Sequence, residues 1–250
     1  MLDMTVNLPS TEDVWKDMLA QEVVPGKREV LQRFFKTGPG EYAEGDVFIG
    51  VTVPSVRKVS KLMVDADRDT IGRMLGSEVH EHRLSALLVL VELYRRARRE
   101  PGVRKEIAMY YLDHIKAADN WDLVDLTAPK ILGEYICETG ETGILYRLSE
   151  STDLWEQRVA IVSTFALLRA GRKDVTLEIA RRYLGHTHDL IHKASGWMLR
   201  EMGKHVGEDV LLAFLDEYAA VMPRTMLRYS IEKLDMAQRR YYMSLKGKRS

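Results

Sequence analysis

The chain has 250 residues, 46% hydrophobic and 30% charged, and its formal net charge of +0 argues by itself against a nucleic-acid binder. Its longest apolar run, near Leu84 to Val91, falls far short of the roughly 20 residues of a membrane helix, and its first residues lack a secretion-signal pattern, so we expect a cytoplasmic protein. Cys137 is the only cysteine, which excludes an internal disulfide framework and a thiolate metal site.

Hydrophobic residues recur at helical spacing along nearly the whole chain, and strand-like alternation is limited to residues 47–51. The pattern therefore predicts an all-α fold. Caps, prolines and glycines predict the elements in chain order. A loose tail over 1–9 precedes helices over about 11–22 and 25–36 and a loop over 37–46. A helix from Pro54 to about 63, a helix capped by Asp67, and a long helix capped by Ser77 and ending near 99 follow.

Later helices recur at a regular interval. Apolar helices begin near Trp121, Trp155 and Leu190, at intervals of 34 and 35 residues. Such a period predicts stacked helical repeats. Because the fixed signatures of tetratricopeptide and ankyrin units are missing, the pattern indicates a degenerate HEAT-like array, in one domain over 10–250. Such an array curves, and its inner helices line a concave surface.

Charge is distributed unevenly along the chain. From Arg158 to Ser250 there are 17 Lys and Arg against 10 Asp and Glu, a net charge of +7, so residues 1–157 carry −7. A polarised chain can present one basic face to phosphates. The same imbalance is also compatible with charges that are merely solvated.

A stripe of basic residues with one ring follows the helix predicted from Asp189 to about His205. At spacings of three and four residues, one helix face gathers Lys193, Trp197, Arg200 and Lys204. Cations interleaved with an aromatic ring are typical of surfaces that follow a nucleic-acid backbone. Trp197 alone would equally fit a buried core position. Arg224 and Arg228 form another basic pair four residues apart.

Trp121 and Asp125 also lie four residues apart and so share a helix face. A ring and a carboxylate there could grip a flat or cationic ligand, or could be a core ring beside a capping carboxylate. Arg158 lies near the repeat position of Asp125, so the two are expected to face the same concavity. Pro129 should break the helix after Thr127, close to Asp125.

Histidines give only weak signals for a metal site. His186, His188 and His192 cluster in sequence, and His80 and His82 flank Glu81. Positions two apart on a helix diverge by about 200°, so we expect solvated imidazoles rather than metal ligands. The sequence also lacks the phosphate-binding loop, nucleophile-elbow and zincin motifs.

Several short motifs, in order and spacing, resemble the DNA alkylation repair proteins of the AlkD type, which are HEAT-like repeat DNA glycosylases. The resemblance spans roughly residues 27 to 235. The motifs that carry it are Arg33 to Gly38, Phe48 to Val51 followed by Val53-Pro54, Trp121 to Asp125, Trp155 to Ile161, Lys193 to Glu201, and Met222 to Tyr229.

The resemblance implies a curved right-handed solenoid whose basic groove holds duplex DNA, and a monomer that needs neither metal nor cofactor. It implies a catalytic trio of Trp121, Asp125 and Trp197, acting on N3- or N7-alkylated purines such as 3-methyladenine and 7-methylguanine. Phe34 stands where the best-known member has a tyrosine near the lesion. The residues expected to bind DNA are Arg158, Lys193, Arg200, Lys204, Arg224, Arg228 and Phe34.

The implied reaction suits these residue types. Alkylation at N3 or N7 makes the purine cationic, so the leaving group is already activated and one carboxylate is enough. Asp125 would stabilise the developing oxocarbenium ion and orient the attacking water. Two alternatives use the same scaffold without chemistry: a protein that binds a DNA structure, and an adaptor whose basic groove takes an acidic protein partner.

Overall fold

The computed structural model describes residues 11–245, and the predicted tail over 1–9 lies outside this range. The fold is all-α, as predicted: 71% of the chain is helical, and the described residues contain isolated β-bridges but no strand. No helix in this range is long and apolar enough to cross a membrane. The chain divides into two compact units, one up to Leu123 and one from Val124 onwards.

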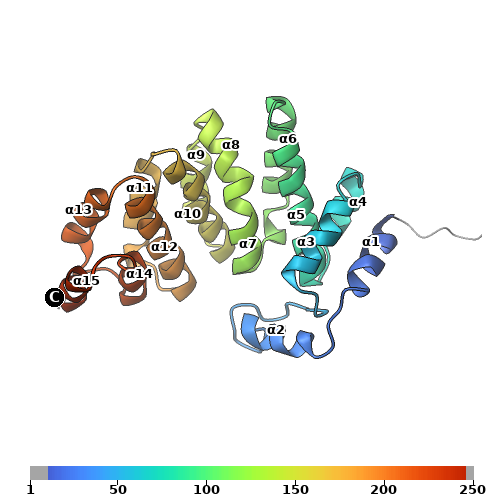
Figure 1. Cartoon of the computed structure of the whole chain (residues 1–250), viewed down its shortest axis with the longest axis horizontal. Helices are drawn as coiled ribbons and strands as arrows, with labels where there is room; N and C mark the ends of the chain where they lie inside the picture. Colours follow the sequence, from blue (N-terminus) through green and yellow to red (C-terminus); the bar gives the residue numbers. More distant parts are fainter. Residues whose placement is uncertain (1–10, 246–250) are drawn as a thin grey trace, which may run out of the picture. The chain divides into compact units, whose positions relative to one another are not determined.

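The first unit is built around one long helix, α5 (His80–Arg96), most of which is buried. Helix α5 packs against α3, α4 and α6 (Figure 1), and the indole N–H of Trp15 on α1 donates to the Ser85 hydroxyl on α5 at 2.9 Å. The other helices of this unit are α1 (Thr11–Ala20), α2 (Lys27–Phe35), α3 (Val53–Leu62), α4 (Arg68–Leu75) and α6 (Pro101–Asp113).

One predicted helix cap in this unit is correct and one is wrong. Asp67 caps α4, because its carboxylate accepts from the Thr70 amide at 2.7 Å. Ser77 does not cap α5, which begins only at His80. The reason is a contact distant in sequence: Val79 is extended and forms a bridge with Val47, and the His80 amide donates to the Val47 carbonyl at 2.8 Å.

The second unit stacks helices in pairs. Its long helices α10 and α12 pack against each other, and α12 also packs against α14 (Figure 1). The helices are α7 (Trp121–Thr127), which begins in the first unit, α8 (Leu132–Thr139), α9 (Gly143–Ser149), α10 (Leu154–Arg169), α11 (Asp174–Arg182), α12 (Asp189–His205), α13 (Glu208–Tyr218), α14 (Arg224–Ser230) and α15 (Met236–Ser244).

The predicted period is visible in where these helices begin. Helices α7, α10 and α12 begin at residues 121, 154 and 189, at intervals of 33 and 35 residues against the predicted 34 and 35, and α14 begins after a further 35, at residue 224. The predicted break is present as well: α7 ends at Thr127 and a 3-10 turn over Ala128–Lys130 contains Pro129. Asp125 therefore lies in the last turn of a short helix.

Close backbone approach in this unit depends on Gly196, on α12. A Cβ placed on Gly196 would lie 2.6 Å from the Cβ of Tyr229 on α14, and closer still to the Met226 carbonyl oxygen. Real side chains do not approach this closely, so α12 and α14 can pack at this distance only because residue 196 has no side chain. The next residue is Trp197, so this contact also fixes the helix that carries one predicted site residue.

We expect Gly196→Ala to lower the free energy of unfolding by about 1–3 kcal/mol, because overpacking forces the two backbones apart. Gly143→Ala is the matched control, since Gly143 is exposed at the start of α9 and a Cβ added there would meet nothing within 4 Å. Chemical denaturation of both variants measures the difference. Equal stability of the two would contradict this explanation of the α12–α14 contact.

Candidate functional site

Trp121, at the start of α7, belongs to an aromatic cluster rather than to the deep core. Its ring is stacked on Phe35 with centroids 5.1 Å apart, and Phe34 meets it edge-on at 5.9 Å. Trp121 is partly exposed and Phe34 is 62% exposed. The structure thus places two of the predicted site residues side by side, with apolar ring surface open to solvent.

A buried network of charged residues packs against this aromatic cluster. His80 lies between two carboxylates, with Nδ1 2.8 Å from Asp46 and Nε2 3.0 Å from Asp122. Arg83 donates to Asp46 and Asp119, both at 2.8 Å. Burial disfavours the charged imidazole, but the hydrogen bonds and charges of Asp122 and Asp46 outweigh it and raise the pKa of His80 to about 9.

The prediction of solvated imidazoles at this position is therefore wrong, because His80 and His82 are only 2% and 8% exposed. Sequence reasoning also missed the function of the residue between them. The Glu81 carboxylate accepts from the backbone amides of Gly50 at 2.8 Å, of Ile49 at 3.0 Å and of Val51 at 3.1 Å. The available signal in the sequence was that four consecutive polar residues, 80–83, directly precede the apolar run of α5.

The other histidine cluster likewise has partners within the protein. His188 Nδ1 accepts from the Leu190 amide at 3.2 Å at the start of α12, and His186 Nε2 lies 2.9 Å from the side-chain oxygen of Gln157. His192 bonds to the His186 carbonyl. These imidazoles hold a loop and a helix start, and the part of the chain that the structure describes contains no group of His, Cys, Asp or Glu arranged to bind a metal.

Asp125 and Arg158 meet directly. The Arg158 guanidinium donates to both carboxylate oxygens, from Nε at 3.0 Å and from Nη2 at 2.8 Å, and its Nη1 donates to the Leu190 carbonyl at 2.7 Å. The side chains of Arg158 and Asp125 are 6% and 18% exposed. Arg158 is therefore placed to orient Asp125, whereas its burial leaves little of it for a phosphate.

The basic stripe on α12 is interleaved with carboxylates. Lys193 pairs with Asp189 at 2.8 Å. Glu201 accepts from the Trp197 indole at 3.1 Å and from Arg200 at 3.2 Å. These contacts make the face less positive than the spacing of its cations predicts, and Trp197 is partly exposed rather than in the core.

The remaining predicted DNA-binding cations occupy different settings. Arg200 also pairs with Glu232 on the segment after α14. Lys204 is exposed and lines a hollow of about 390 Å³ that also contains Glu208. Arg224 and Arg228 are both exposed, but Arg224 also donates to the Met243 carbonyl at 2.5 Å. Of this group, Lys204 and Arg228 present the most accessible charge.

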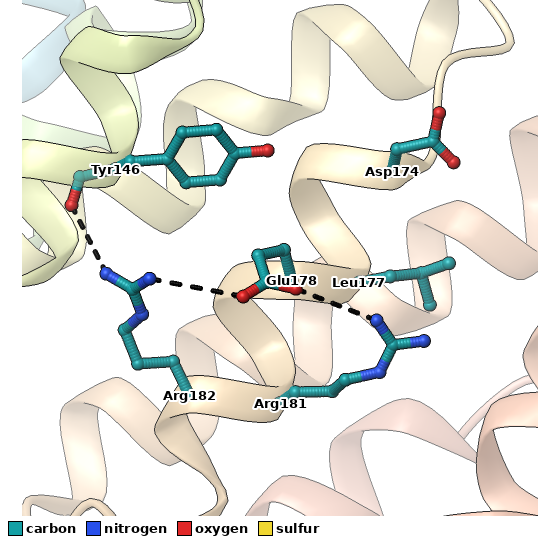
Figure 2. Close-up of a pocket in the computed structure, with 6 residues that line it drawn as sticks. All are labelled: Tyr146, Asp174, Leu177, Glu178, Arg181 and Arg182. Atoms are coloured by element: carbon teal, nitrogen blue, oxygen red, sulfur yellow. Dashed lines mark hydrogen bonds and ion pairs between the residues drawn. The ribbon is translucent and has the colours of Figure 1, made fainter.

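Another hollow, of about 500 Å³, contains none of the predicted site residues (Figure 2). Glu178 lies between Arg181 and Arg182 there, and Arg182 also donates to Glu150 at 2.6 Å. Ion pairs thus match the charges of Glu178, Arg181 and Arg182 on the surface of α11 and its neighbours. This arrangement is typical of a solvated helix face.

Comparison with known proteins identifies the family of the chain. Residues 16–234 match the family described as DNA alkylation repair enzyme. The chain belongs to this family. Membership gives it a role in the repair of alkylated DNA, which confirms the resemblance at the level of the family.

A solved structure described as a predicted DNA alkylation repair enzyme from Enterococcus faecalis has the same fold. It superposes with a TM-score of 0.66, at 17% sequence identity, over 86% of this chain and 98% of that chain. No curated protein matches the chain.

We expect Arg158→Gln to lower the free energy of unfolding by about 2–3 kcal/mol, because it leaves the Asp125 carboxylate without its bidentate partner. In a double-mutant cycle with Asp125→Asn, the double variant should lose less than the sum of the single changes, by about 1 kcal/mol or more. Lys193→Gln is the control, since its pair is exposed and should contribute under about 1 kcal/mol. Strict additivity would contradict a structural coupling of Asp125 and Arg158.

Proposed function

We propose that the protein is a DNA glycosylase that removes cationic N3- or N7-alkylated purines from duplex DNA and leaves an abasic site. The observation that carries the proposal is the Asp125 carboxylate, oriented by Arg158 through two hydrogen bonds and only partly buried. It shares α7 with Trp121, four residues earlier, so ring and carboxylate lie on one face of the helix.

The chemistry needs no acid catalyst. The bond between C1′ and the purine nitrogen breaks with its electron pair leaving on the purine, which neutralises the positive charge of the alkylated base. A deoxyribose cation develops at C1′, and water adds there and loses a proton. A fixed carboxylate stabilises that developing charge, because its orientation costs nothing at the moment of reaction. Arg158 supplies this orientation to Asp125.

The two tryptophans would act by packing and by charge. An indole face attracts a cationic base with about 0.5–2 kcal/mol per good contact. Trp121 offers a partly exposed face beside Phe34, and the Trp197 ring is held by Glu201. That Trp197 joins Trp121 and Asp125 at one site remains a prediction, as do the DNA contacts of Lys193, Arg200, Lys204, Arg224 and Arg228.

One observation favours the alternative of a DNA-binding protein without chemistry. Both oxygens of Asp125 already accept hydrogen bonds from Arg158, which spreads the carboxylate charge onto an internal partner. In that case Asp125 would be a structural anchor for α7, and its removal would affect stability but no reaction.

The decisive assay is release of 3-methyladenine and 7-methylguanine from methylated duplex DNA under single-turnover conditions. The wild type should release base well above the uncatalysed rate, and Asp125→Asn should be slower by about 100-fold or more. Because Asp125→Asn also weakens the contact with Arg158, circular dichroism must show it folded. Lys105→Gln, at an exposed lysine of α6 outside the predicted site, is the matched variant expected to keep near-full activity.

Absence of release by the wild type would contradict the proposed reaction. Equal rates for wild type and a folded Asp125→Asn would contradict the role of Asp125 alone.

DNA affinity across a salt series separates both DNA-binding hypotheses from a protein adaptor. The logarithm of the association constant should fall by about 0.9 for each phosphate contacted per tenfold rise in salt. Lys204→Gln and Arg228→Gln, which remove accessible cations, should each reduce that slope by about 1. A flat salt dependence measured by fluorescence anisotropy would be incompatible with duplex DNA as the partner.

A further inference from the structure

With Asp46 and Asp122 both ionised, the bonds of His80 require both of its ring nitrogens to carry a proton. Nδ1 faces the Asp46 carboxylate at 2.8 Å, and Nε2 faces the Asp122 carboxylate at 3.0 Å. A neutral imidazole has one N–H and one lone pair, so one nitrogen would direct its lone pair at a carboxylate oxygen. The geometry is satisfied only by the doubly protonated ring.

Asp122 depends on its bond to His80 more than Asp46 does. Asp46 also accepts from Arg83 at 2.8 Å and from the Asn120 amide at 2.9 Å. The second oxygen of Asp122 is buried and has no hydrogen-bond partner among the described residues. Loss of one His80 proton leaves a single N–H for two carboxylates. Kept on Nε2, that proton holds Asp122 but turns the Nδ1 lone pair towards Asp46; kept on Nδ1, it leaves Asp122 buried without its partner. Either tautomer breaks one of the two bonds at a cost in free energy.

The consequence falls on Trp121, which is the neighbour of Asp122 in the first turn of α7. The Trp121 amide donates to the Asn120 side-chain oxygen at 2.8 Å, and Asn120 in turn is held by Asp46. A second path runs through rings: His80 is stacked on Phe48 at 4.3 Å, Phe48 on Phe35 at 4.9 Å, and Phe35 on Trp121.

We propose that His80 is a positioning residue: as an imidazolium shared between Asp46 and Asp122, it fixes the first turn of α7 and so sets the exposed face of Trp121. Its importance for catalysis rests on the function proposed above. The position of the Trp121 ring is a property of the protein without DNA, and can be measured separately.

Each element packed against His80 contributes charged groups to its surroundings. The loop before α3 contributes Asp46, and the segment before α7 contributes Asp119. Helix α7 contributes Asp122, and α5 itself contributes Arg83 and Glu81. Lys27 of α2 lines a hollow of about 280 Å³ that is also lined by His80. Three backbone amides of the loop hold the Glu81 carboxylate. The two ring N–H groups of the His80 imidazolium are therefore directed at Asp46 and Asp122.

The direction of the pH effect follows from these contacts. The pKa of His80 is raised from 6.5 to about 9, since the bonds to Asp122 and Asp46 outweigh burial. The contact is therefore intact at neutral pH and is lost as the pH rises through about 9. His82, two residues away, has a pKa lowered by burial to about 4 and stays neutral over the same range.

The test is ¹⁹F NMR of the protein labelled with 5-fluorotryptophan, with the Trp121 signal assigned from Trp121→Phe. Between pH 7 and 10 the Trp121 signal should shift with a midpoint near 9, while the Trp155 and Trp197 signals should not follow it. The shift should vanish in His80→Gln and persist in His82→Gln, which removes the neighbouring buried imidazole and is the matched control.

In the base-release assay, the wild-type rate should fall above pH 9. His80→Gln should be slower by about tenfold at pH 7.5 and insensitive to pH in this window, while His82→Gln follows the wild type. Should His80→Gln not fold, Asp122→Asn removes one of the two carboxylates with little change in volume. His80 then keeps only Asp46, so the midpoint of the Trp121 titration should fall clearly below 9.

A Trp121 signal that stays constant from pH 8 to 10, or that titrates unchanged in His80→Gln or Asp122→Asn, would overturn the positioning function of His80. Normal titration together with no base release by the wild type would instead overturn the proposed reaction and leave the positioning intact. Normal titration with a rate that does not fall above pH 9 would show that the position of Trp121 does not govern catalysis, and would overturn that part of the inference.

Discussion

Negative charge on α7, buried at one position and partly buried at another, must be matched by a cation, and the structure depends on this constraint at two points of one short helix. Asp122 in its first turn is matched by His80 from α5, and Asp125 in its last turn by Arg158 from α10. An unpaired carboxylate at such positions would cost several kcal/mol, whereas a paired one is held in a single orientation. The short helix that carries the predicted catalytic residues is therefore fixed by ion pairs as well as by packing.

This arrangement explains how a protein could act on a cationic base without a metal or a general acid. The substrate brings its own positive charge, so the enzyme needs a negative group that is held still and a flat surface on which the base and sugar can pack. In the proposed reaction Asp125, oriented by Arg158, would provide the first, and Trp121, stacked on Phe35 beside Phe34, would provide the second. Membership of the DNA alkylation repair enzyme family gives this interpretation its context.

Local signals in the sequence predicted much of this, and contacts distant in sequence account for the failures. Helix α12 and the break after Thr127 follow from spacing and from Pro129, and the interval of 33 residues between Asp125 and Arg158 is close to one repeat. The start of α5 could not be predicted, because the Val47 bridge that delays it comes from a loop more than thirty residues earlier. Part of the neutralisation of the α12 stripe was likewise hidden, since Glu232 is 32 residues from Arg200. Asp189 and Glu201, in contrast, lie on α12 itself and could be read from the sequence.

The most direct test of the central claim is the affinity for duplex DNA carrying a sugar analogue that mimics the reaction's charge. A duplex with a cationic pyrrolidine in place of one deoxyribose resembles the oxocarbenium ion, and a neutral tetrahydrofuran abasic site is its uncharged counterpart. Because catalysis requires tighter binding of the transition state, the wild type should prefer the cationic duplex by about 10-fold or more, and Asp125→Asn should lose that preference. Equal affinity of the wild type for both duplexes would contradict the claim that Asp125 stabilises positive charge on the sugar.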